Sequence, residues 1–286
     1  MIRTLFAALL LPAFAFADEP IGDAAKDLPI FDAHIHYKEP AWGPYPPETV
    51  IELMDRNGVA MGLVSSTPDQ GTILLWEHAP NRIVPELRPY HGTAGSSNWM
   101  AAYGMEQYLE QRLELYPHEG LGEFHVRAMA GANEDLLRKV AEMAMERNIP
   151  IHIHSDDAPV RFFFEIAPEL TIIWAHVGMS SPPEVIGPLM DTHDRLFADT
   201  SYRESDILEG DGLDPEWRDL LIRHADRFMI GSDTWVNGQW DDYDGIISMN
   251  REWLSHLPFD VAVKIAYQNA ENLFDRRIGK DLIGTR

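Results

Sequence analysis

The sequence contains no cysteine. A disulfide bond, a thiolate metal ligand and a cysteine nucleophile are therefore excluded, and any bound metal ion must use nitrogen and oxygen ligands. Positive charge is also scarce, because 23 lysine and arginine residues face 46 aspartate and glutamate residues, for a formal net charge of −23. This charge disfavours nucleic acid and anionic membrane surfaces as partners and leaves a small molecule as the expected substrate.

Long hydrophobic runs are missing after the first 17 residues. The chain begins with one positive charge, residues 4–16 are almost entirely apolar, and Ala15-Phe16-Ala17 fits the pattern that precedes signal peptidase cleavage. We expect residues 1–17 to be a signal peptide, which leaves 286 − 17 = 269 residues in a periplasmic or secreted protein. A membrane anchor is the alternative, but the run is shorter than the roughly 18 residues of a spanning helix.

Apolar runs alternate with helical patterns along the rest of the chain. The runs that predict strands cover residues 29–36, 59–64, 82–90, 120–126, 149–154, 170–176, 196–201 and 228–232. Helical spacing and capping residues predict helices over residues 47–57, 72–78, 99–116, 133–147, 162–167, 184–190, 214–225, 246–257 and 260–274. Eight such βα units in this length predict an α/β fold, a single-domain (β/α)8 TIM barrel formed by residues 18–286.

Two histidines one residue apart end the first predicted strand, Phe31-Asp32-Ala33-His34-Ile35-His36. Side chains alternate between the faces of a strand, so we expect His34 and His36 to project to one face together with Asp32. Two imidazoles that reach one point suit a transition metal. Hydrogen-bonded core histidines are the alternative, and Asp32 is expected to orient a ligand or to serve only a structural hydrogen bond.

Residue types that bind metals also fall at the ends of later predicted strands. In a barrel of this kind, the loops at the carboxyl ends of the strands converge on one pocket. Packing alone does not place such residues at the same end of five strands. The candidate ligands are His34, His36, Glu123, His154, His176 and Asp233, whereas His125 and His152 lie one pleat deeper and are expected to support them.

The ordered combination of these residues resembles the amidohydrolase superfamily of metal-dependent barrels. The resemblance rests on His34-x-His36, on His154, on Trp174-Ala175-His176-Val177-Gly178 and on Gly231-Ser232-Asp233. The closing segment Asn269-Ala270-Glu271-Asn272-Leu273-Phe274 is similar to the tail of the amidohydrolase-related branch. Gly122-Glu123 and His154-Ser155-x-Asp157-Ala158 also resemble TatD-like and phosphotriesterase-like hydrolases.

The resemblance implies a role for each candidate ligand. His34, His36 and Asp233 would hold one metal ion, and Asp233 would also accept a proton from a bound water. His154 and His176 would hold a second ion. In one-metal relatives His154 joins the first set, and His176 acts as a catalytic base or polarises the substrate. Zinc suits nitrogen and oxygen ligands first, and manganese, iron and nickel are compatible.

Glu123 decides between these two arrangements. As a bridge it would complete a centre with two divalent metal ions per chain. Alternatively, it is a strand-end carboxylate that is bonded to a neighbouring histidine such as His125, and the chain then holds one ion.

The resemblance also implies a hydrolase in which metal-activated water attacks a small ester, lactone or amide. Arg88 and Arg203 follow the third and seventh predicted strands and are expected to bind a substrate carboxylate, and Arg161 is a weaker candidate. Ion pairs with the abundant acidic residues are the alternative for all three. Non-oxidative decarboxylation of an aromatic carboxylic acid is a second hypothesis, and a catalytically inactive metal-binding barrel is a third.

Overall fold

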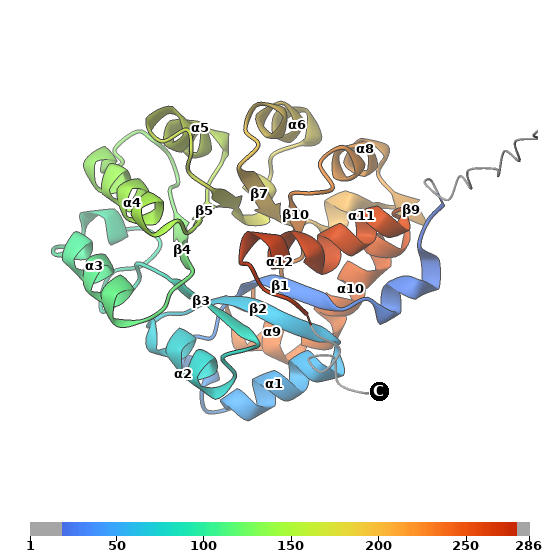
Figure 1. The fold of residues 1–286 in the computed structure, drawn as a ribbon, viewed down its shortest axis with the longest axis horizontal. Coiled ribbons are helices and arrows are strands. Elements are labelled where there is room, and N and C mark those ends of the chain that lie inside the picture. The colour runs from blue at the N-terminus through green and yellow to red at the C-terminus, as the bar shows by residue number, and fades with distance from the viewer. Residues whose placement is uncertain (1–18, 279–286) are drawn as a thin grey trace, which may run out of the picture.

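Eight parallel strands form the centre of the computed structural model, which describes residues 19–278 (Figure 1). The predicted signal peptide lies outside the described residues. The strands are β1 (Ile30–Ile35), β2 (Val59–Ser65), β3 (Ile83–Leu87), β4 (Gly120–His125), β5 (Ile151–His154), β6 (Ile172–Trp174), β7 (Leu196–Asp199) and β10 (Phe228–Met229). Their order in the sheet follows the chain, and the predicted TIM barrel is confirmed.

The sheet closes between its first and last strands. Asp32 forms an isolated parallel bridge with Ile230, and the amide of Ala33 donates to the carbonyl of Ile230 at 2.7 Å. Further along both segments, the amide of Asp233 donates to the carbonyl of His34 at 2.6 Å. The chain after β10 therefore stays beside β1, and this pairing brings Asp233 next to the histidines.

Helices surround the barrel, as the ring of coiled ribbons in Figure 1 shows. Asn133 caps the longest of them, because its side chain accepts from the amide of Leu136, and Asp214 caps α8 in the same way. The helices are α1 (Pro47–Arg56), α2 (Gln70–His78), α3 (Met105–Leu115), α4 (Glu134–Arg147), α5 (Asp157–Ile166), α6 (Pro183–Thr192), α7 (Glu204–Ile207), α8 (Pro215–Arg223), α9 (Asn237–Asp241), α10 (Tyr243–Ser255), α11 (Phe259–Val263) and α12 (Asn269–Leu273).

Two predicted helices are divided in the structure. The segment 99–116 contains a short 3-10 turn (Trp99–Ala101) and then α3, and Gly104, with a φ of 75°, directly precedes α3. The segment 260–274 consists of α11, a π-helical turn (Lys264–Gln268) and α12. A small hairpin, β8 (Leu208–Glu209) with β9 (Gly212–Leu213), follows α7 and was not predicted.

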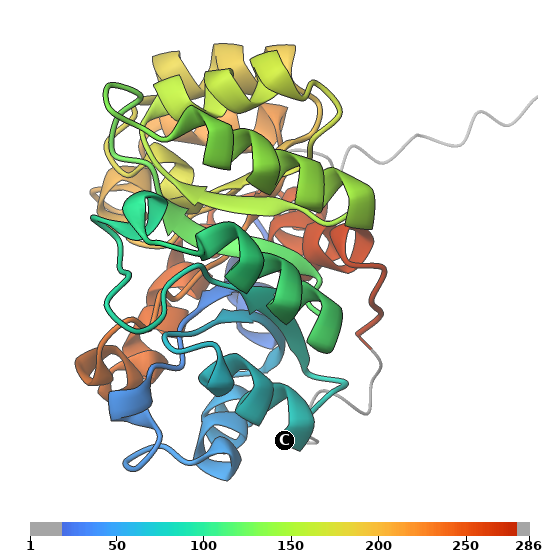
Figure 2. The ribbon, with the colours of Figure 1, turned by 90° about the vertical axis from the view of Figure 1, so that its left-hand side faces the viewer.

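Apolar side chains close one end of the barrel. Phe31 and Ala33 of β1 pack with residues of β2, β3, β6 and β10 against α12, and the rings of Phe31 and Phe274 stack with their centroids 5.8 Å apart. In Figure 2, α12 lies on the right and the loops after β1 and β3 lie on the left. The opposite, carboxyl end of the strands is therefore the end left open for polar residues. No helix within residues 19–278 combines the length and apolar character needed to cross a bilayer.

Candidate metal centre

All six predicted ligands meet at the carboxyl end of the barrel. Three groups of three residues place their nitrogen and oxygen atoms within 4.8 Å of one another and could hold a metal ion. We call the six predicted ligands the carboxyl-end cluster. The three groups are His34 with His36 and Asp233, Glu123 with His154 and His176, and His34 with His176 and Asp199.

The first group has spacings that suit one tetrahedral ion. The Nε2 atoms of His34 and His36 are 3.1 Å apart, and Oδ1 of Asp233 lies 3.5 Å from the first and 3.2 Å from the second. Ligands about 2.1 Å from a zinc ion in tetrahedral geometry are about 3.4 Å from each other. Two imidazole nitrogens and one carboxylate oxygen face one another at that spacing, which suits a metal ion among them.

In two histidines of the carboxyl-end cluster, a backbone carbonyl accepts a hydrogen bond from the ring nitrogen that faces away from the centre. Nδ1 of His36 donates to the carbonyl of Ser65 at 2.7 Å, and Nδ1 of His176 donates to the carbonyl of Ser201 at 3.1 Å. Because a carbonyl oxygen only accepts, both rings carry their proton on Nδ1 and direct a bare Nε2 lone pair at the centre. Nε2 of His176 is buried and has no hydrogen-bond partner among the described residues. These donors therefore fit a metal ion.

Glu123 connects the two halves of the cluster. Its Oε2 lies 3.3 Å from Nε2 of His36, and its Oε1 lies 3.9 Å from Nε2 of His176. Oε1 also accepts from Nδ1 of His154 at 2.7 Å. His125, the alternative partner considered from the sequence, is more distant at 3.9 Å and stacks on His154 with the ring centroids 3.9 Å apart.

Arg88 pairs with Glu123 inside the protein. Its Nε donates to the backbone carbonyl of Glu123 at 3.0 Å, and its Nη2 donates to Oε2 at 2.5 Å. The ring of Tyr90 covers the guanidinium at 4.5 Å. From the sequence, Arg88 was expected either to bind a substrate carboxylate or to pair with an acidic residue of the protein. The contacts in the structure match the second alternative.

Arg203 binds the turn that follows β6. Its guanidinium donates to the carbonyls of His176, Val177 and Ser181 at 2.8–3.2 Å, and its Nε donates to Asp206 at 2.6 Å. The residue is only 2% exposed. Protein oxygens already engage Nε, Nη1 and Nη2 of Arg203, which matches the ion-pair alternative to the expected contact with substrate. Arg161, the weaker candidate, forms an exposed ion pair with Asp157.

Replacing Arg203 with methionine is expected to destabilise the protein and to leave KM little changed. Buried carbonyls would lose a charged donor, which typically costs about 1.5–3 kcal/mol of unfolding free energy. Urea denaturation measures this loss, and Arg161→Met is the matched control because its exposed pair contributes little. A raised KM with unchanged stability would instead indicate a contact with substrate.

The backbone around the cluster is strained in three segments, which follow β6, β7 and β10. Within residues 19–278, seven residues other than glycine have positive φ, and five of them lie here. Positive φ is costly for side chains with a Cβ, most of all for a β-branched residue, and such residues gather at functional sites. The five are His176 (54°), Val177 (42°), Met179 (54°), Tyr202 (62°) and Asp233 (46°).

Three buried residues beneath the cluster form a charged chain. Nδ1 of His152 lies 3.2 Å from Glu86, and its Nε2 lies 3.0 Å from Asp199. Asp199 in turn faces Nδ1 of His34 at 3.2 Å, so this chain orients a predicted ligand. The sequence predicts a supporting role for His152 but does not identify Glu86 or Asp199. Asp199 ends β7, so the strand-end criterion that selected the other candidates could have found it.

Asp32 does not share the environment of His34, contrary to the expectation from strict alternation. The register between β1 and β2 shifts between Asp32 and Ile35. The Asp32 carboxylate accepts from the amides of His34 and Ser232 and from the hydroxyl of Tyr243, which lies on α10 outside the barrel. Asp32 therefore supports the closure of the barrel.

Burial and neighbouring charges set the protonation of the cluster. Burial lowers the pKa of His34, but the carboxylates of Asp199 and Asp233 outweigh it and raise the pKa to about 9. Burial raises the pKa of Asp233, yet the charge of His34 and the close approach of His36 lower it to about 2. Burial lowers the pKa of His176 to about 4. At neutral pH, Asp233 is therefore ionised and His176 is neutral.

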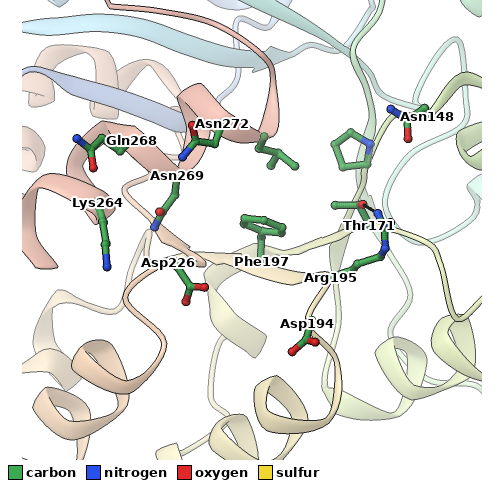
Figure 3. A pocket seen from close by; sticks show the side chains of 12 residues that line it. Asn148, Thr171, Asp194, Arg195, Phe197, Asp226, Lys264, Gln268, Asn269 and Asn272 are labelled. Carbon is green, nitrogen blue, oxygen red and sulfur yellow. Dashed lines mark hydrogen bonds between the residues drawn. The ribbon is translucent and has the colours of Figure 1, made fainter.

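A polar cavity of 560 Å³ lies near the other end of the barrel and contains none of the predicted site residues. Figure 3 shows Asn269 and Asn272 on one side of it and Asp194 and Arg195 on the other. Its walls come from segments that precede β5, β6 and β7 and from the π-helical turn. Catalysis in barrels of this type occurs at the carboxyl end, so this cavity is not the candidate centre.

Comparisons with known proteins identify the family and the fold. The family model described as Amidohydrolase matches residues 102–276. No curated protein matches the sequence. A TatD homologue from Escherichia coli aligns with 15% identity and a TM-score of 0.63 over 87% of this chain and 98% of its own. Dihydroorotase from Campylobacter jejuni aligns with 12% identity and a TM-score of 0.53 over 88% of this chain and 85% of its own. At these identities the two structures show a shared fold.

Proposed function

This chain belongs to the amidohydrolase family, and from that membership we propose that it is a metal-dependent hydrolase of a small ester, lactone or amide. The observation that carries the proposal is the arrangement of bare acceptor atoms at the carboxyl end of the barrel. His36 and His176 direct Nε2 lone pairs at the same centre as the Asp233 carboxylate, and backbone carbonyls hold both rings in that state.

His34, His36 and Asp233 would hold the ion, and their nitrogen and oxygen donors suit zinc first, with manganese, iron and nickel also compatible. A divalent ion in this position would supply Lewis acidity and bring the ionisation of water towards a pKa of about 7. Asp233 would accept a proton from the attacking water, because its carboxylate stays ionised. His176 would accept a hydrogen bond from the other hydrogen of the same water, since its neutral Nε2 lies 3.8 Å from Oδ2 of Asp233.

The arginines make decarboxylation the weaker hypothesis. That reaction was expected to use Arg88 or Arg203 to hold a substrate carboxylate. Arg88 is engaged by Glu123, and Arg203 is engaged by three carbonyls and Asp206. Both guanidinium groups are therefore bonded to protein oxygens instead of being available to bind the carboxylate of an aromatic acid.

Export remains part of the proposal. It rests on the apolar run and the cleavage pattern within residues 1–17. We expect the protein to be recovered from the periplasm or the medium, and fractionation followed by N-terminal sequencing would test this. A chain that retains Met1 in the cytoplasmic fraction would contradict it.

A panel of small esters, lactones and amides tests the reaction itself. The expected result is release of a carboxylic acid from members of one of these classes, followed by a pH-stat. Aromatic carboxylic acids are assayed beside them for release of carbon dioxide. Carbon dioxide production without hydrolysis would replace the proposed reaction with decarboxylation, and binding of metal without either activity would favour an inactive barrel.

A further inference from the structure

The pairing of Arg88 with Glu123 bears on how many metal ions the centre accepts. We propose that Arg88 takes the place of a second metal ion and restricts the centre to one ion, held by the group that contains His34, His36 and Asp233. This inference rests on the proposed function, because it concerns the metal ion of the same site. It assigns to Arg88 a role as a positioning residue that acts through Glu123.

The Arg88–Glu123 pair is closed to solvent. The two side chains are 7% and 2% exposed, and Arg88 makes two hydrogen bonds to the same residue. Tyr90 covers the guanidinium from one side. Breaking a buried pair by removing one partner leaves a desolvated charge, so the arginine stays with its carboxylate.

Both carboxylate oxygens of Glu123 already have a donor. Arg88 donates to Oε2, and His154 donates to Oε1 at 2.7 Å. A bridging carboxylate must instead give one oxygen to each of two ions. The 2.7 Å separation is that of a direct hydrogen bond, whereas two ligands of one tetrahedral ion lie about 3.4 Å apart. Glu123 and His154 would have to separate before they could share an ion.

The charges around the centre favour one ion as well. The carboxylates that approach the Nε2 atoms are those of Asp233 and Glu123. Arg88 is a cation beside them and pairs directly with Glu123. A second divalent ion would add two further positive charges beside the Arg88 guanidinium. Such a charge is costly in a buried site.

Removing the guanidinium is therefore expected to create a second metal site. Without Arg88, Glu123 would keep a charge that needs a partner. The Oε1 atom of Glu123 and one ring nitrogen each of His154 and His176 already lie within 4.8 Å of one another and could serve as three metal ligands. The structure thus predicts a gain of metal binding from a substitution that removes no metal ligand.

Metal content per folded chain tests this inference. Protein is loaded with Zn²⁺, passed through gel filtration and analysed by elemental mass spectrometry. We expect about one ion in the native protein, about two in Arg88→Met and about one in the double variant Arg88→Met/Glu123→Gln. Arg112→Met is the matched control, because Arg112 forms another buried pair, with Asp69, and its loss should leave the count at about one.

Two results would overturn the inference. One is about two ions in the native protein, and the other is a folded Arg88 variant that stays at about one ion. If Arg88→Met does not fold, Arg88→Gln keeps a hydrogen bond to Glu123 without the charge and replaces it in the test. Failure of the proposed function gives a distinct result. A native protein that binds one ion but hydrolyses none of the substrates would contradict the reaction without contradicting the role of Arg88.

Discussion

Replacing Asp233 with asparagine is expected to lower kcat about 10²–10⁴-fold for whichever ester, lactone or amide the protein hydrolyses. The amide keeps the shape of the carboxylate but carries no negative charge and is a poor proton acceptor, and a positioned acid or base contributes about this factor. Steady-state kinetics with metal in excess measures the loss. Circular dichroism and urea denaturation establish that the variant is folded.

Asp226→Asn is the matched control for this substitution. Asp226 is an exposed carboxylate beside the cavity near the other end of the barrel, so its loss should leave kcat unchanged. An Asp233→Asn variant that keeps kcat within about tenfold of the native value would contradict the role given to this residue.

Replacing His152 with leucine is expected to lower the free energy of unfolding by about 3–5 kcal/mol. The substitution leaves Glu86 and Asp199 buried without their shared partner, and breaking a buried ionic contact has a cost of this size. Urea denaturation of the metal-free protein measures the effect. The exposed His78→Leu serves as the control, and a loss below about 1 kcal/mol would show that the charged chain does not support the barrel.

The effect of His152 should depend on pH. Burial lowers the pKa of His152, but Glu86 and Asp199 raise it from 6.5 to about 10. A group with a raised pKa in the folded state stabilises it fully below the unfolded pKa, and this stabilisation is lost as the pH rises through the folded pKa. The stability difference between the native protein and His152→Leu should therefore be large at about pH 6 and shrink by about pH 10. A constant difference would mean that His152 acts without its charge.

The sequence predicted the barrel and the carboxyl-end cluster because both depend on local patterns. Near-continuous apolar runs identified the strands, and the topology of parallel βα units brings their carboxyl ends together. His34, Glu123 and His176 are distant in the chain, yet a single criterion, their place at the end of a strand, selected all of them. That criterion needed no knowledge of which strands are neighbours.

The sequence did not predict which side chains and carbonyls from different loops contact one another. Arg88 and Arg203 also follow strands, but whether a guanidinium faces substrate or protein depends on carbonyls and carboxylates that other loops supply. Asp32 was misplaced because the irregular register within β1 breaks the simple alternation of faces. For both arginines, these carbonyls and carboxylates include residues more than 20 positions away in the sequence.

We propose that hydrolysis requires a divalent metal ion held by the carboxyl-end cluster. The most direct test is to strip the protein with a chelator, return Zn²⁺ or Mn²⁺, and follow hydrolysis of the best substrate of the panel at each stage. The native protein should lose activity on stripping and recover it on return of metal, whereas Asp233→Asn should not recover. Full activity in the stripped protein would contradict it.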